Sequence, residues 1–228
     1  DLARHEVDSV AAGDIAAVSG IRDVTIGDTI ASPEAPEPLE RIAIEEPTVK
    51  MTFGVNTSPF SGKDGKYATS RVLWARLQRE LQTNVSLRVE RTGSADEFMV
   101  SGRGELHLSV LIENMRREGM EFQVSKPEAV TKLVDGKLHE PFELLTVETR
   151  EEFFGLLTED LASRLGQMTD MQNDGDKNVR FVYKLPTRGL IGFRSFFLRA
   201  SRGNGVMNSE FTGYEPARGE LESTRTGV

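Results

Sequence analysis

The stretch Ser101–Gly119 reads SGRGELHLSVLIENMRREG, and a second stretch of the same design, Leu185–Gly203, reads LPTRGLIGFRSFFLRASRG. Each begins as an extended run, turns through an Arg-Gly pair and opens a helix with an apolar stripe that ends in basic residues and a glycine. The residues before each stretch follow the same order of strand, helix and hairpin. The sequence therefore predicts two copies of one small α+β module, an arrangement that favours a docking protein over an enzyme with a single cleft.

The first copy is expected at residues 47–130. Apolar residues alternate from Val49 to Val55, as in a half-buried strand, and the leucines of Ser70–Gln82 recur every fourth residue, as on the buried side of a helix. The predicted order is a strand at 47–56, a helix at 70–82, hairpin strands at 85–90 and 97–101, a helix at 105–118 and a strand at 121–125. This βαββαβ order predicts a ferredoxin-like sandwich with both helices on one face of an antiparallel sheet.

The second copy is expected at residues 131–228. Its predicted order is a strand at 142–149, a helix at 153–165, hairpin strands at 167–171 and 179–185, a helix at 190–200 and a strand at 205–211. The helix at 153–165 is expected to bury Leu156, Leu157, Leu161 and Leu165. The turn Asn173-Asp174-Gly175-Asp176 is the strongest hairpin signal in the chain. Because element type and order agree in two copies, the predicted fold class is α+β with two tandem ferredoxin-like modules.

Residues 1–46 read differently from both modules. The segment AAGDIAAVSGIRDVTIGDTI has short apolar alternations broken by Gly-Asp turns, which predicts a few strands of a truncated β-barrel. Ser32–Pro38, with three prolines in seven residues, is expected to be a linker. Residues 1–46 hold three basic and eleven acidic side chains and thus account for the whole formal charge of −8. The two modules are therefore close to neutral, and local clusters say more about partners than the overall charge does.

Composition excludes several classes of protein. The absence of cysteine rules out disulfides and thiol catalysis and fits a reducing cytoplasm. No apolar run is long enough to cross a bilayer, so no membrane role is expected. The chain starts at Asp1 without an initiator Met or a targeting signal, so we expect a piece of a longer protein.

The sequence predicts no catalytic, cofactor-binding or metal-binding site. Asp170–Asn178 resembles a calcium loop, but Phe181 stands where the bidentate glutamate would have to be. Ser61–Lys66 has a Gly-Lys pair but lacks the other residues of a phosphate-binding loop. His107 lies beside an apolar stripe and is interpreted as structural.

Basic residues are the candidate binding residues. The segment Lys184–Arg202 contains no acidic residue and holds one set of five basic residues: Lys184, Arg188, Arg194, Arg199 and Arg202. Arginines suit phosphate contacts, and the helix opening at Arg188-Gly189 would favour an anion. A merely solvated basic face is an equally good interpretation from charge alone. In the first module the corresponding residues are Lys63, Lys66 and Arg103, where acidic neighbours make the solvated interpretation the better one.

Four segments resemble a known superfamily. AAGDIAAVSGIRDVTIGDTI is similar to the end of the β-barrel domain of translational GTPases, and SGRGELHLSVLIENMRREG resembles their third domain. NTSPFSGKDGKYATSR and LPTRGLIGFRSFF are similar to the TypA/BipA branch and differ from elongation factor G and LepA-type factors. The resemblance covers essentially the whole chain, with the modules as the third and fifth domains.

The resemblance implies a ribosome-stimulated GTPase that acts in translation, ribosome assembly and stress or virulence responses. The chain has no phosphate loop, no switch motif and no guanine motif, so GTP and Mg²⁺ are expected only in a G domain outside these residues, and no enzyme activity is expected here. The implied partners are the protein's own G domain and, near the GTPase-associated centre, ribosomal RNA and ribosomal proteins. The arginines around Leu190–Ala200 and Lys184 would contact RNA phosphates, and Lys63, Lys66 and Arg103 would serve the small-subunit or G-domain side.

Two rival interpretations remain open. Tandem ferredoxin-like modules also occur as small-molecule sensors, which would need a concave apolar pocket with converging polar groups. A scaffold that binds protein and no RNA would bind with weak salt dependence, because phosphate contacts lose affinity steeply as salt rises.

Overall fold

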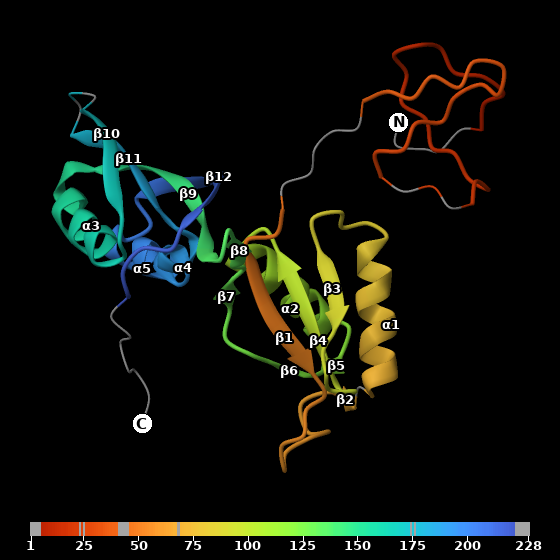
Figure 1. The fold of residues 1–228 in the computed structure, drawn as a ribbon, viewed down its shortest axis with the longest axis horizontal. Coiled ribbons are helices and arrows are strands. Elements are labelled where there is room, and N and C mark those ends of the chain that lie inside the picture. Colours follow the sequence, from red (N-terminus) through yellow and green to blue (C-terminus); the bar gives the residue numbers. More distant parts are fainter. Residues whose placement is uncertain are drawn as a thin grey trace. The chain divides into compact units, whose positions relative to one another are not determined.

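The computed structural model describes residues 6–22, 24, 26–40, 46–67, 69–173, 175 and 177–221, with the backbone alone for Lys66 and Tyr67. The chain divides into two compact units, Asp1–Ala43 and Ile44–Val228. Figure 1 shows the ribbon of both units.

The described residues of the first unit contain no helix and no strand. The one β-type backbone pairing among these described residues is an isolated antiparallel bridge between Ser32 and Ala35. The prediction of short barrel strands is therefore wrong for these residues. The side chain of Ile15 is fully exposed and that of Ile26 is 55% exposed, because a strand needs a neighbouring strand for pairing and burial and the described residues supply none.

The first module of the second unit is an antiparallel sheet covered by two helices. Its main elements are β1 (Val49–Gly54), β2 (Lys66–Tyr67), α1 (Ser70–Leu81), β3 (Arg88–Arg91), β4 (Glu97–Gly102), α2 (Glu105–Arg117), β5 (Met120–Glu121), β6 (Gln123–Val124) and β7 (Glu128–Ala129). The sheet order is β3-β4-β1-β6, with β7 also paired to β1 and with β2 and β5 forming a separate parallel pair. This is the order of a ferredoxin-like sandwich, as predicted.

Both helices of this module pack on the same face of its sheet. Every second side chain of β1 is buried, and these side chains share one core with Leu73 and Leu77 of α1 and Leu108 and Leu111 of α2. Thr69 caps α1 by accepting the N–H of Val72 at 3.4 Å. Burial of each of the four core leucines of α1 and α2 stabilises the fold by about 1.5–3 kcal/mol.

The second module repeats this architecture with longer strands. Its elements are β8 (Lys132–Val134), β9 (Lys137–Arg150), α3 (Glu151–Ser163), β10 (Gln167–Asn173), β11 (Asn178–Pro186), α4 (Thr187–Leu190), α5 (Phe193–Ala200) and β12 (Gly205–Pro216). The sheet order is β10-β11-β9-β12, with β8 paired to β9. The core combines side chains of β9 and β11 with Phe153, Leu157 and Leu161 of α3 and with Phe193 and Phe197 of α5.

Two details of the second module differ from the predictions, and the predicted hairpin turn is described only in part. Leu156 is 51% exposed, because α3 turns the series Phe153, Leu157 and Leu161 toward the sheet. The predicted helix at 190–200 is two helices, α4 and α5, separated at Gly192. In the predicted hairpin turn, Asn173 Oδ1 accepts the N–H of Gly175 at 3.1 Å, while Asp174 and Asp176 lie outside the described residues.

Every helix in the described part of the chain is too short or too polar to cross a bilayer.

Candidate nucleic-acid interface

Helix α5 is anchored by aromatic side chains and begins at a glycine. Gly192 has φ of 76°, a left-handed conformation that glycine adopts without steric cost. Phe193 and Phe197, one helical turn apart, are buried against the sheet. At the other end, the hydroxyl of Ser201 donates to the carbonyl of Phe197 at 2.7 Å. The helix is thereby fixed at both ends with its opposite side facing solvent.

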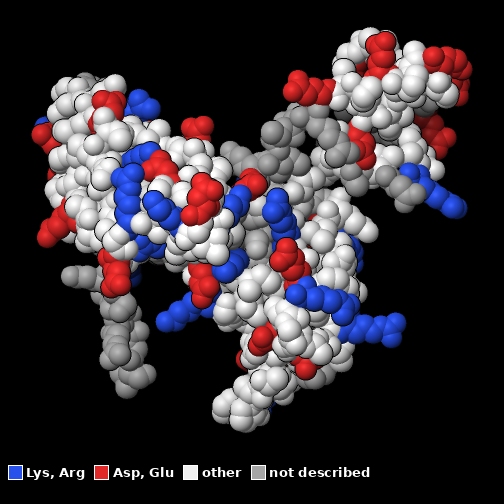
Figure 2. All heavy atoms as spheres, in the orientation of Figure 1, with Lys and Arg blue, Asp and Glu red and all other residues white. Residues whose placement is uncertain are grey.

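Three arginines occupy that solvent side. Arg194 and Arg199 of α5 and Arg202 just after it are all exposed, and none of them forms an ion pair with another described residue. Figure 2 shows basic and acidic side chains interspersed on the second module, whereas acidic side chains predominate on the first unit. These three predicted site residues therefore keep their charge available to a partner.

Arg188 is not available in the same way. Its guanidinium donates to the carboxylate of Glu140, with Nη2 at 3.1 Å from Oε1, and to the carbonyls of Arg218 at 2.6 Å and Gly219 at 3.0 Å. Glu140 is only 2% exposed and also accepts the N–H of Arg218 at 3.1 Å. Arg188 thus joins α4, β9 and the segment after β12, which is a structural role that the spacing in sequence did not reveal.

Lys184 is also engaged. Its ammonium pairs with Glu215 on β12 and lies 5.9 Å from the centre of the Phe142 ring. Of the five basic residues predicted in this module, two are therefore held by internal partners and three are not paired with any other residue that the structure describes.

The anion expected at the start of the second helix is present, but it is a carboxylate of the protein itself. Helix α5 opens at Gly192 and not at Arg188-Gly189, and the N–H of Gly192 donates to Oε2 of Glu105 at 2.8 Å. Glu105 belongs to the first turn of α2. Since helix N-termini favour negative charge, this carboxylate stabilises α5 and connects the two modules.

Arg103 lies at the turn between β4 and α2, beside His107. The backbone N–H of Arg103 donates to Nδ1 of His107 at 3.2 Å, which leaves the proton of the neutral ring on Nε2, 3.1 Å from Oδ1 of Asn84. Burial, and then the positive charge of Arg103, lower the pKa of His107 from its ordinary 6.5. A neutral histidine that accepts a backbone hydrogen bond here agrees with the structural interpretation of His107.

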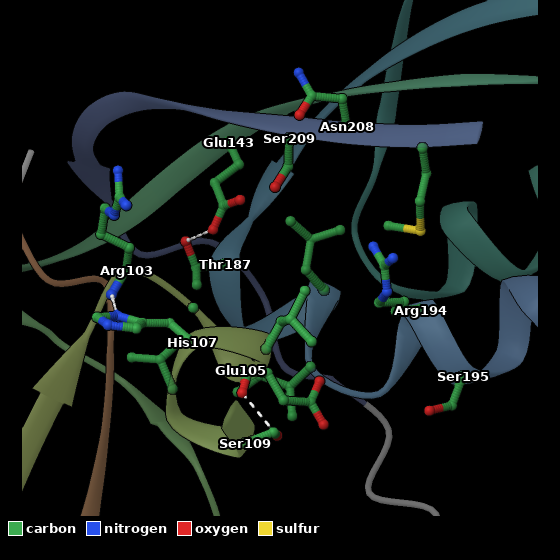
Figure 3. A pocket seen from close by; sticks show the side chains of 16 residues that line it. Arg103, Glu105, His107, Ser109, Glu143, Thr187, Arg194, Ser195, Asn208 and Ser209 are labelled. Carbon is green, nitrogen blue, oxygen red and sulfur yellow. Dashed lines mark hydrogen bonds between the residues drawn. The ribbon is translucent and has the colours of Figure 1, made fainter. Parts of the chain in front are cut away.

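Arg103 and Arg194 line one groove of about 400 Å³ between the modules. Figure 3 shows them on opposite sides of this groove, with Glu105 of α2 and Glu143 of β9 also lining it. Glu143 accepts the hydroxyl of Thr187 at 2.8 Å. The groove thus carries as many acidic as basic side chains, whereas Arg199 and Arg202 do not line it, and α5 itself holds no acidic residue. Phosphate binding is therefore better supported on α5 than inside the groove.

Lys63 lies in a different place, on the loop between β1 and β2. Its ammonium lies 4.8 Å from the centre of the Phe60 ring, and both side chains are exposed. The side chain of Lys66 lies outside the described residues. The structure therefore brings Arg103 and Arg194 together but leaves Lys63 on a separate surface of the first module.

No three His, Cys, Asp or Glu side chains of the described residues are placed to hold a metal ion.

The chain is similar to parts of elongation factor G and to longer curated proteins. Residues 66–126 match the family model "Elongation Factor G, domain III", and residues 137–225 match "Elongation factor G C-terminus". The large ribosomal subunit assembly factor BipA of Bacillus subtilis is 49% identical over 228 residues, which is 100% of this chain and 37% of that protein. A chloroplastic protein of Arabidopsis thaliana described as TypA-like is 52% identical over 98% of this chain and 33% of its own length.

A third relative, the large ribosomal subunit assembly factor BipA of Synechocystis, is 48% identical over 100% of this chain and 38% of its own length. The chain thus spans only about a third of the curated relatives that it matches.

Proposed function

Because the chain belongs to the TypA/BipA family of translational GTPases, we propose that these two modules dock a protein of that family on the ribosome. The relatives named above as assembly factors of the large ribosomal subunit suggest that docking serves the maturation of that subunit. The compartment would then be the one that holds ribosomes, which in a bacterium is the cytoplasm.

The observation that carries the proposal is the solvent side of α5. Arg194, Arg199 and Arg202 are exposed and unpaired among the described residues, on a helix whose other side is fixed by buried phenylalanines. Exposed guanidinium groups on a helix that is fixed by its buried side suit the phosphate backbone of folded RNA, which proteins bind largely through shape and charge. We assign the contact to RNA phosphates, with no base-specific readout.

Nucleotide chemistry is no part of this proposal. The sequence lacks the phosphate-loop and guanine-binding motifs, so GTP hydrolysis would belong to a G domain elsewhere in the full-length protein. The modules would contribute affinity and position to that reaction and no catalytic group.

The test is co-sedimentation of the chain with purified large subunits and with 70S ribosomes across a salt series. We expect binding that falls steeply as salt rises, because each phosphate contact contributes about 0.7–0.9 to the slope of log K against log salt. The double variant Arg194→Glu/Arg199→Glu should bind at least about tenfold more weakly and lower that slope by about 2.

The matched control is Arg116→Glu/Arg117→Glu on α2, which reverses the same number of charges on arginines that pair with Glu113. This control should bind like the unchanged chain. Equal binding by both double variants would show that α5 is a solvated face. Binding without salt dependence would favour the scaffold that contacts protein alone.

A further inference from the structure

The loop between β1 and β2 presents an aromatic ring to solvent. Phe60 is 65% exposed, and among the aromatic side chains that the structure describes it alone is exposed; the others are buried or partly buried. The ammonium of Lys63 lies 4.8 Å from its ring centre. Phenylalanine is more often buried than exposed, so a solvent-facing ring beside a cation is a candidate for contact with a partner.

This loop is held in one conformation by a carboxylate at its base. Glu121 of β5 is only 9% exposed, and it accepts the N–H of Gly62 at 2.8 Å, the N–H of Asp64 at 3.1 Å and the side-chain amide of Asn56 at 2.5 Å. These bonds, that of Gly62 foremost, lower the pKa of Glu121 from its ordinary 4.5. The carboxylate is therefore ionised at neutral pH and ties the two ends of the loop together.

Short turns fix the part of the loop that carries the ring. The N–H of Ser58 donates to the side chain of Asn56 at 3.0 Å, and the N–H of Phe60 donates to the hydroxyl of Ser58 at 3.3 Å. The N–H of Lys63 then bonds the carbonyl of Phe60 at 3.2 Å. Because the backbone is ordered before any partner arrives, binding would cost little further conformational entropy.

We propose that Phe60 stacks on an unpaired base of RNA while Lys63 neutralises the adjoining phosphate. Sequence-tolerant RNA binding combines these two elements, an aromatic face and a cation along the backbone. The proposal rests on the ribosome-docking function above. It identifies the RNA feature that the first module would bind as an unstacked base, whereas α5 would bind the phosphate backbone.

An apolar pocket on a protein fits this loop less well. Such a pocket would bury the Lys63 ammonium with the ring, and burial of an unpaired charge is costly, whereas an RNA phosphate pairs with it. Protein-binding sites also tend to be contiguous apolar patches, and the ring is flanked by Pro59 and the polar residue Ser61.

The experiment uses the whole chain with Phe60→Trp as a fluorescent reporter, in a background in which the one native tryptophan is replaced, Trp74→Phe. The probe is an oligouridine of about 12 nucleotides, and the comparison is an RNA duplex of similar length. We expect the single strand to quench the reporter fluorescence in a saturable manner and the duplex to quench it little. Equal quenching by both would overturn the proposal, because it would show attraction to phosphate without base stacking.

Affinity gives a second readout without a reporter. Phe60→Ala should weaken binding of the oligouridine about tenfold, while Phe60→Tyr, which keeps the aromatic face, should bind almost as the unchanged chain does. Thermal unfolding of both variants checks that the loop change leaves the cores folded. If Phe60→Ala lowers ribosome binding but leaves oligouridine affinity unchanged, the ring docks on protein and the proposal is wrong.

Failure of this inference is distinguishable from failure of the docking function. Normal ribosome binding by Arg194→Glu/Arg199→Glu, together with single-strand quenching of the Phe60→Trp reporter, would reject the role of α5 and keep that of Phe60. The reverse pattern would keep docking through α5 and reject stacking.

Discussion

At the scale of single residues, the pair formed by Arg188 and Glu140 shows how a basic residue of a predicted RNA site can be part of the fold. The guanidinium is 25% exposed and its carboxylate partner 2% exposed. We expect Arg188→Ala to lower the free energy of unfolding by about 2–4 kcal/mol, because it leaves a buried carboxylate without its positive partner. Urea unfolding at pH 7 measures this change.

The matched control is Arg117→Ala, which removes an arginine that is 77% exposed and paired with Glu113 on the surface. That substitution should change stability by less than about 0.5 kcal/mol. A loss at Arg188 as small as at Arg117 would mean that water or another group compensates Glu140.

His107 predicts a pH dependence of stability. Its pKa in the folded chain is lowered by burial and by Arg103, so the unfolded chain takes up a proton at higher pH than the folded chain does. The contribution of the neutral ring is therefore complete above pH 6.5 and is lost as pH falls from 6.5 through the lower folded value. The melting temperature should drop in this range, since a protonated Nδ1 no longer accepts the Arg103 N–H.

Replacement of either of two histidines tests the assignment. His107→Gln should remove that part of the pH dependence, whereas His139→Gln, on the hairpin of β8 and β9, should retain it. An unchanged pH profile in His107→Gln would show that another group titrates.

At the scale of elements, a substitution at the end of α5 should change ribosome binding and stability in opposite directions. Arg202 has φ of 52°, a left-handed conformation that costs a residue with a Cβ roughly 1 kcal/mol. Arg202→Gly should remove that cost. Because glycine also gives the unfolded chain more conformational entropy, the free energy of unfolding should rise by no more than ~0.5–1 kcal/mol. It should nevertheless weaken ribosome binding, because one guanidinium is lost.

Arg199→Gly is the matched comparison inside the same helix. It removes the same charge but should lower stability by about 1 kcal/mol, since glycine is unfavourable in a helix interior. Both variants should lose similar affinity while their melting temperatures move in opposite directions. If affinity instead follows stability, the arginines act through the fold and not through contact with RNA.

The elements that sequence could predict are those set by local periodicity. Leu73 and Leu77, or Phe193 and Phe197, repeat every four residues and are buried as expected. Leu156 shows the limit, because Leu156 and Leu157 are adjacent and only the position of α3 on the sheet decides which one faces inward.

The candidate site was less predictable than the fold. Glu140 lies 48 residues before Arg188, and Glu105 lies 87 residues before Gly192, so neither partner follows from local pattern. The local cluster of basic residues identified the arginines. Only the packing of β9 against α4 shows that Arg188 is held by an internal carboxylate. Gly192 was the one local signal for the break between α4 and α5, because glycine inside a helical pattern favours an interruption.

At the scale of the whole molecule, the two modules have separate hydrophobic cores. Each core contains residues of its own sheet and helices, with Leu111 in the first and Leu157 in the second. Among the described residues, the polar connections between modules include the N–H of Gly192 donating to the Glu105 carboxylate, the hydroxyl of Tyr214 donating to the carbonyl of Pro47, and the ion pair of Lys132 with Glu46. Hydrogen bonds and surface ion pairs of this type contribute about 1 kcal/mol each, far less than either core.

We therefore expect the modules to unfold with considerable independence. Leu157→Ala should lower the stability of the second module by about 2–5 kcal/mol, because it leaves a cavity where the side chain is fully buried. Hydrogen exchange should then accelerate at the protected amides of β9 and β11 but not at those of β1 and β4. Leu111→Ala, the matched change in the first module, should give the opposite pattern.

If either substitution accelerates exchange in both sheets equally, the contacts between the modules, including the hydrogen bond from Gly192 to Glu105, couple them into one cooperative unit. A Glu105→Gln variant, which keeps the shape but removes the charge, should then loosen that coupling.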